Sequence, residues 1–263
     1  MGFAAVGAQV AKAWTEAFRV GWKVYLFHLK TRRRRNWLGL IWVIVPLLAA
    51  LGIGLGLQST RLIGQSGLGG LPPAVFVLTG VTFWQVFADA VLMPQRQLAS
   101  FQTELAGGHM TVELALLVGL FDLAFAILFR CLFLLLVVPL LGVSPSLSAA
   151  ALPAFLIVLA TGGLAIGIFT ALPGMLIDDI GRLLAVLLAV AMFTSPVFYR
   201  QLDFIPDWAN PLAPVIEAAR ASATGQPVSV VFLTGCVVVV AAMLVLALSW
   251  LKSGQRRFLS ALR

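Results

Sequence analysis

The sequence predicts an all-α, polytopic membrane protein with six transmembrane helices. Of its 263 residues, 61% are hydrophobic and only 11% are charged, whereas soluble domains carry about 25% charged residues. Uncharged runs of about 20 residues recur along the chain, and each is long enough to cross a hydrocarbon layer of about 30 Å as a helix. The runs do not alternate apolar with polar residues as barrel strands do. They therefore favour helices, which satisfy their own backbone hydrogen bonds in lipid.

The segment 1–36 is predicted to be a cytoplasmic, interfacial element. An amphipathic helix over 10–30 would place Phe18, Trp22 and Tyr25 on one face and basic side chains such as Arg19 and Lys23 on another. Such a helix is typical of the headgroup region of a membrane. The alternative is a helix whose aromatic face packs on the rest of the same protein.

Six crossings follow from the apolar runs. We expect them at 37–57, 73–92, 112–139, 151–172, 183–199 and 229–251, so that 37–251 forms one transmembrane domain and 252–263 a basic cytoplasmic tail. Of the 18 basic residues, eight precede the first crossing and four follow the last. Basic flanks stay on the cytoplasmic side, so both termini are predicted to be cytoplasmic. The net charge of +8 therefore indicates contact with anionic membrane lipids rather than with nucleic acid.

The sequence lacks the motifs that would carry catalysis. It contains no GxxxxGK[ST] phosphate loop, no HExxH metal motif and no serine in a GxSxG frame. We therefore expect no enzyme, no metal site and no cofactor bound by this chain. A membrane-embedded glycolipid-modifying enzyme is a weaker alternative, for which Asp178 and Asp179 are the only adjacent acidic pair.

Two charges and two glycine pairs lie inside the predicted crossings. Asp122 and Arg130 share the third crossing and stand about 12 Å apart along a helix, too far for direct contact. They indicate either a polar pathway or structural contacts with other helices. The pairs Gly52/Gly56 and Gly163/Gly167 fit the GxxxG spacing, which predicts close helix packing.

Aromatic residues gather near the predicted outer surface. They favour an interfacial belt, and a sugar-stacking path for a glycan is the alternative. The candidate path residues, with the two intramembrane charges, are Trp42, Phe83, Trp84, Phe87, Asp122, Arg130, Phe198, Tyr199 and Trp208.

The segment 195–220, SPVFYRQLDFIPDWANPLAPVIEAAR, contains four prolines and cannot form one continuous helix. At membrane depth such a break is tolerated only inside protein or beside an aqueous cavity. We therefore expect a short break and return on the outer side.

On this segment the chain resembles the membrane subunits of ABC-2 type polysaccharide exporters, the O-antigen, capsule and teichoic-acid permeases. The likeness rests on SPVFY at 195–199, on NPLAP at 210–214, on LGLIW at 38–42 with Pro46, and on DIG at 179–181. It implies re-entrant helices between the fifth and sixth crossings. The residues that match this motif are Ser195, Pro196, Asn210, Pro211, Pro214, Glu217 and Arg220.

The resemblance also implies partners and a role. It implies a homodimer in the bacterial inner membrane, paired with two copies of an ATP-binding subunit that holds ATP and Mg, and a lipid-linked polysaccharide as the substrate. By the same resemblance, the residues that contact the ATPase are Arg32, Arg33, Arg34, Arg35, Arg96, Glu104 and His109. The alternative within the same topology is a permease for a drug or small lipid.

Overall fold

The computed structural model of the protein describes residues 16, 18–27, 29–30, 41–60, 70–144, 147–177, 179–199 and 210–261. In these residues all regular structure is helical, as the sequence predicts. The labelled elements are α2 (Ile41–Thr60), α3 (Pro73–Ser100), α4 (Gln102–Ala106), α5 (Val112–Leu140), the 3-10 helix η2 (Leu147–Ala151), α6 (Leu152–Leu176), α7 (Asp179–Thr194), α8 (Ala213–Ala223) and α9 (Val230–Ala261).

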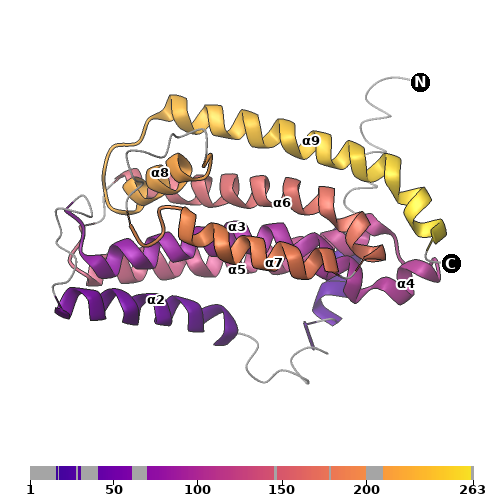
Figure 1. Cartoon of the computed structure of the whole chain (residues 1–263), viewed down its shortest axis with the longest axis horizontal. Helices are drawn as coiled ribbons and strands as arrows, with labels where there is room; N and C mark the ends of the chain where they lie inside the picture. The colour runs from indigo at the N-terminus through magenta and orange to yellow at the C-terminus, as the bar shows by residue number, and fades with distance from the viewer. Residues whose placement is uncertain are drawn as a thin grey trace.

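The long helices lie side by side along the longest axis of the molecule (Figure 1). The short helix α8 lies at one end of this bundle, and α4 lies at the other end, near the C-terminal end of α9 (Figure 1). The chain therefore presents two opposite ends, which we call the α8 end and the α4 end.

Helix α3 forms the centre of the bundle. It packs against α2, α5, α6, α7 and α8, and 83% of its most apolar stretch is buried, compared with 6% for α9. Helix α9 packs mainly on α6 and leaves most of its apolar surface exposed. Such an exposed apolar surface suits contact with lipid.

Glycines set the closest helix contacts. A Cβ added at Gly163 of α6 would lie 2.6 Å from the Phe87 carbonyl oxygen of α3, and one at Gly167 would collide with the Val91 carbonyl oxygen. The packing role predicted for this GxxxG pair is therefore confirmed.

The same prediction is wrong for Gly52 and Gly56 of α2. No described atom lies within 4 Å of a Cβ added at either residue, whereas one at Gly54 would lie 2.5 Å from Ala74 Cα. The GxxxG spacing does not record which face of a helix meets its neighbour, and here α3 meets the opposite face of α2, which carries Gly54.

Four segments in the described part of the chain are long and apolar enough to cross a membrane: Pro73–Ser100, Val112–Leu140, Leu147–Leu176 and Val230–Gly254. Helix α2 is apolar over the shorter stretch Val43–Ser59. Helix α7 has 16 residues and spans about 24 Å, less than a hydrocarbon layer of about 30 Å. The count of six crossings stays a prediction.

Several boundaries differ from those predicted. Helix α3 continues past 92 to Ser100 with Pro94 inside it, because neighbouring helices enclose the turn that lacks a backbone hydrogen bond. Helix α7 begins at Asp179 rather than 183 and ends at Thr194 rather than 199, where the turn of the SPVFY motif begins. Helix α9 extends past 251 into the predicted tail.

The predicted amphipathic helix packs on the protein itself. The backbone is helical at 18–27, and the rings of Phe18, Trp22 and Tyr25 lie 5.0, 5.3 and 5.6 Å from the ring of Phe121 on α5. Phe18 and Trp22 remain 56% and 45% exposed. The packing alternative therefore describes this structure, and a position in the headgroup region stays a prediction.

Candidate functional site

An ion pair joins α3 to α5 within two of the helices that are long and apolar enough to cross a membrane. Arg130 Nη2 donates to Asp89 Oδ2 at 2.5 Å, and Arg96 Nη1 lies 3.9 Å from Asp89 Oδ1. The side chain of Arg130 is 5% exposed, and that of Asp89 is 41% exposed. The carboxylate therefore has one buried cation on one side and one exposed cation on the other.

This pair agrees with one of the two sequence interpretations of Arg130, and the polar pathway stays a prediction. Its partner is on another helix, which agrees with a structural contact and with the prediction that Asp122 lies too far away. Asp122 is half-buried elsewhere on α5. Asp89 was not among the predicted site residues, because it lies only three residues before 92, where the second crossing was predicted to end. The spacing of Gln85, Asp89 and Arg96 on one helical face was the available signal.

The polar groups around this pair are incompletely satisfied. Arg130 Nε and Nη1, and the Oε1 atom of Gln85, are buried with no hydrogen-bond partner among the described residues. A buried polar group without a partner costs about 1–3 kcal/mol. The centre of α3 therefore carries a polar cluster that would gain from water or from a hydrogen-bonding ligand.

At the α8 end, Arg220 fastens α8 to α3. Its Nη2 donates to the Pro196 carbonyl at 2.7 Å and its Nε to Thr79 Oγ1 at 3.3 Å. The guanidinium also lies 3.7 Å from the centroid of the Phe76 ring, a distance at which a cation and an aromatic face attract. Arg220 is only 4% exposed, so these contacts are shielded from solvent.

Asn210 joins the two halves of the proline-rich motif. Its Nδ2 donates to the Thr194 carbonyl at 3.2 Å and to Ser195 Oγ at 3.1 Å. Its Oδ1 accepts from the Leu212 N–H at 3.2 Å, a local turn that asparagine favours. The structure thus brings together the motif residues Ser195, Pro196, Asn210 and Arg220. The re-entrant helices stay a prediction.

The remaining motif residues shape α8 and its surface. Pro214 lies in the first turn of α8, where a proline sacrifices no helical hydrogen bond. Pro211 is exposed, and Glu217 is half-buried. Glu217 and Pro214 line an open groove of about 280 Å³ between α8 and the start of α9.

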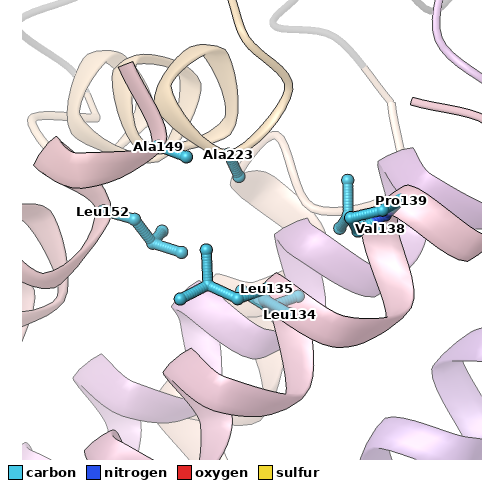
Figure 2. A pocket seen from close by; sticks show the side chains of 7 residues that line it. All are labelled: Leu134, Leu135, Val138, Pro139, Ala149, Leu152 and Ala223. Atoms are coloured by element: carbon cyan, nitrogen blue, oxygen red, sulfur yellow. The ribbon is translucent and has the colours of Figure 1, made fainter. Parts of the chain in front are cut away.

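A second, smaller pocket lies beneath α8. Figure 2 shows its lining side chains from α5, η2, α6 and α8: Leu134, Leu135, Val138, Pro139, Ala149, Leu152 and Ala223. Its volume of about 10 Å³ is close to the minimum for one water molecule. A sugar ring cannot enter this pocket in the present conformation.

The predicted aromatic path residues separate into two groups. Phe83, Trp84 and Phe87 are buried inside the chain, at 0%, 3% and 5% exposure. Phe198 and Tyr199 follow α7 and are half-buried. The Phe198 ring stacks 5.9 Å from that of Phe193, and the Tyr199 hydroxyl donates to the Phe193 carbonyl. Trp208 and the side chain of Trp42 lie outside the described residues.

The structure describes three of the seven residues that are expected to contact an ATPase. Arg96, Glu104 and His109 lie in or beside α3 and α4, at the α4 end, and all three are exposed. Glu104 is in α4, and its carbonyl accepts from the His109 N–H at 2.9 Å. Arg32, Arg33, Arg34 and Arg35 lie outside the described residues.

Comparison with known proteins provides the family. Residues 23–224 match the ABC-2 type transporter family, a range that includes the ion pair, the proline-rich motif and helices α2 to α8. A search of curated proteins gave no match. Proteins of this family are membrane-spanning transport components that normally work with an ATP-binding subunit. The match covers most of the chain, and the protein therefore belongs to the ABC-2 type transporter family as a multi-pass membrane component.

Proposed function

We propose that this permease exports a polysaccharide or lipid-linked glycan across the bacterial inner membrane, with both of its termini in the cytoplasm. Two copies of the chain would form the path, and two copies of a separate ATP-binding subunit would hold ATP and Mg and drive transport. Segments 1–36 and 252–263 would lie on the cytoplasmic side of the transmembrane domain 37–251. The family match supports the pairing with an ATP-binding subunit.

The observation that carries the glycan proposal is the folded proline-rich motif. Asn210 links it to Ser195, and Arg220 holds α8 against α3. This is the segment on which the resemblance to polysaccharide exporters rests. A short helix held by a few buried polar contacts suits a cover at the outer end of a path, because releasing those contacts would free it.

The polar cluster supports a hydrophilic substrate. In the described part of the chain, Arg130 has donors and Gln85 an acceptor without a partner, and a sugar hydroxyl supplies both kinds of partner. A purely apolar substrate would leave both unsatisfied.

The test is export from proteoliposomes that contain the permease and its ATP-binding partner. We expect ATP-dependent export of a lipid-linked glycan and glycan-stimulated ATP hydrolysis. The control is the same complex in which the phosphate-loop lysine of the partner is replaced by alanine. Export that continues in this control would contradict the ATP-driven mechanism.

A permease for a drug or small lipid is the second candidate. The burial of Phe83 and Trp84 in the core favours it, because these residues do not line an opening that would admit a glycan. Phe198→Ala and Tyr199→Ala test the aromatic path, with Phe125→Ala on the exposed face of α5 as the control. Unchanged glycan export in the first two variants would show that these rings do not line the glycan path, and a wild type that exports no glycan would leave the second candidate.

The enzyme alternative has little support. Asp179 is 82% exposed and pairs with Arg182 at 3.1 Å, and Asp178 lies outside the described residues. Transferase activity of the purified chain alone would revive this alternative.

A further inference from the structure

Residues 93–97 of α3 are enclosed by glycines from three other helices. A Cβ added at Gly119 of α5 would lie 3.2 Å from Gln97 Cγ, and one at Gly167 of α6 would lie 2.9 Å from Pro94 Cδ. Gly174 of α6 and Gly181 of α7 face the same turn from another side. We call Gly119, Gly167, Gly174 and Gly181 the glycine collar. Within it, α3 meets helix surfaces without side chains.

Gln95 occupies the narrowest part of this collar. A Cβ added at Gly174 would lie 2.6 Å from Gln95 Cδ, and one at Gly181 would lie 3.0 Å from Gln95 Nε2. These two glycines flank the joint between α6 and α7, where Ile177 leaves helical geometry with φ −128° and ψ 100°. One side chain of α3 therefore holds both sides of that joint.

The side-chain carbonyl of Gln95 would gain from a further hydrogen bond. Gln95 is 7% exposed, yet its Oε1 has no hydrogen-bond partner among the described residues. An unsatisfied buried acceptor shifts an equilibrium by about 5- to 150-fold toward any state that satisfies it. The adjacent Pro94 has no N–H to donate to the Ala90 carbonyl, which weakens the helix at the same turn.

We propose that Gln95 is a positioning residue for ATP-driven transport. In the present state it holds the α6–α7 joint against α3. When the ATP-binding partner closes at the α4 end, the Pro94 turn bends, Gln95 leaves the collar, and its carbonyl gains a partner. The movement reaches the α8 end through α3, to which Arg220 fastens α8. This inference rests on the proposed ATP-driven cycle but not on the identity of the substrate.

The first test uses two substitutions with opposite expected effects. Gln95→Met retains the length of the side chain and removes the unsatisfied oxygen, so the held state gains stability and export falls about fivefold or more. Gly181→Ala crowds the amide and loosens the joint, so more ATP is hydrolysed for each molecule exported. Gln58→Met at an exposed site on α2 and Gly235→Ala, whose Cβ meets no described atom within 4 Å, are the matched controls.

A merely structural role for Gln95 would change the amount of folded complex and leave the ratio of export to hydrolysis unaltered. The measurements are therefore this ratio and the yield of assembled complex. Wild-type ratios in both Gln95→Met and Gly181→Ala would overturn the proposal.

The second test is a disulfide across the collar. A Cβ added at Gly174 lies 3.0 Å from Gln95 Cγ, the atom whose place a cysteine sulfur takes, which suits the short geometry of a disulfide. Gln95→Cys with Gly174→Cys, in a chain that also carries Cys131→Ala and Cys236→Ala, should cross-link in the nucleotide-free complex. Trapping the partner with ATP should reduce cross-linking at least severalfold, and the cross-linked complex should not export.

Equal cross-linking with and without ATP, or export by the cross-linked complex, would overturn the proposal. The cross-link needs only the permease, its partner and ATP. If no glycan is exported by the wild type but cross-linking still responds to ATP, the substrate proposal fails and the role of Gln95 stands.

Discussion

Single side chains carry the polar chemistry of this apolar protein. Asp89 balances Arg130 at the centre of the bundle, and Arg220 connects α8 to α3. Each arginine is at least nine-tenths buried. A buried cation is tolerated only with a partner, so the loss of one contact affects the whole helix pair.

We expect Asp89→Ala to destabilise the protein by about 3 kcal/mol, because it leaves the buried Arg130 without its counter-ion. This is the lower end of the range for buried pairs, since Asp89 is 41% exposed. Adding Arg130→Met should restore most of the lost stability. Asp179→Ala, which breaks an exposed pair, should cost less than about 1 kcal/mol. Thermal unfolding in detergent measures all three, and a double variant as unstable as the single one would contradict the argument.

Arg220→Lys should release α8 although the charge remains. Lysine cannot maintain both the planar contact with Phe76 and the two hydrogen bonds to Pro196 and Thr79. Limited proteolysis of the segment between α7 and α8 should become at least severalfold faster. Glu217→Gln, a neighbouring change on α8, should leave this rate unaltered. Equal protection in Arg220→Lys and the wild type would show that the guanidinium is not required.

Between whole elements, the contact of α3 with α6 depends on small residues. Gly163 and Gly167 bring the backbones together near Phe87 and Val91. In lipid, no hydrophobic effect drives helices together, so close packing has to supply the association. On the same helix, a Cβ added at Gly162 would lie 3.4 Å from Val240 Cγ1 of α9, which is an ordinary van der Waals contact.

This difference provides a matched pair on one helix. Gly167→Ala should destabilise the fold by about 2 kcal/mol, because its Cβ meets the backbone of α3, which cannot move aside as a flexible side chain does. Gly162→Ala should be neutral within about 0.5 kcal/mol. The measurement is the thermal unfolding temperature of each variant and of the wild type in the same detergent. Equal unfolding temperatures would show that α3 and α6 are less tightly packed than the structure indicates.

In the molecule as a whole, α3 is the buried central helix that connects the α8 end with the α4 end. The α8 end carries the proline-rich motif, and the α4 end carries Arg96, Glu104 and His109. The outer helices α5, α7 and α9 expose large apolar side chains. This surface agrees with a membrane setting, in which lipid or a second copy would cover it.

The proposed topology places the two ends on opposite sides of the membrane. In a chain with Cys131→Ala and Cys236→Ala, His109→Cys at the α4 end should react with an impermeant thiol reagent only from the cytoplasm. Gln226→Cys at the α8 end should react only from outside. Both positions are exposed, so the lipid barrier rather than burial determines the reaction. Labelling of both from one side would contradict the six crossings.

The sequence by itself determined the fold class, most helix positions and the family. The starts of α3 at Pro73 and α5 at Val112 agree with prediction, because the length of an apolar run and a nearby proline or threonine cap are local properties. The break of helical structure within the proline-rich motif was also predicted, but the hydrogen bonds of Asn210 that link its two halves were not.

Only the tertiary structure decided which residues meet between helices. The pairing of Arg130 with Asp89, the packing of Gly54 rather than Gly52, and the enclosure of Gln95 by Gly174 and Gly181 depend on how each helix is rotated toward its neighbours. In a chain that is apolar on nearly every face, hydrophobic periodicity does not record that rotation. The rotation of each helix is set by contacts between small residues and between buried charges on different helices.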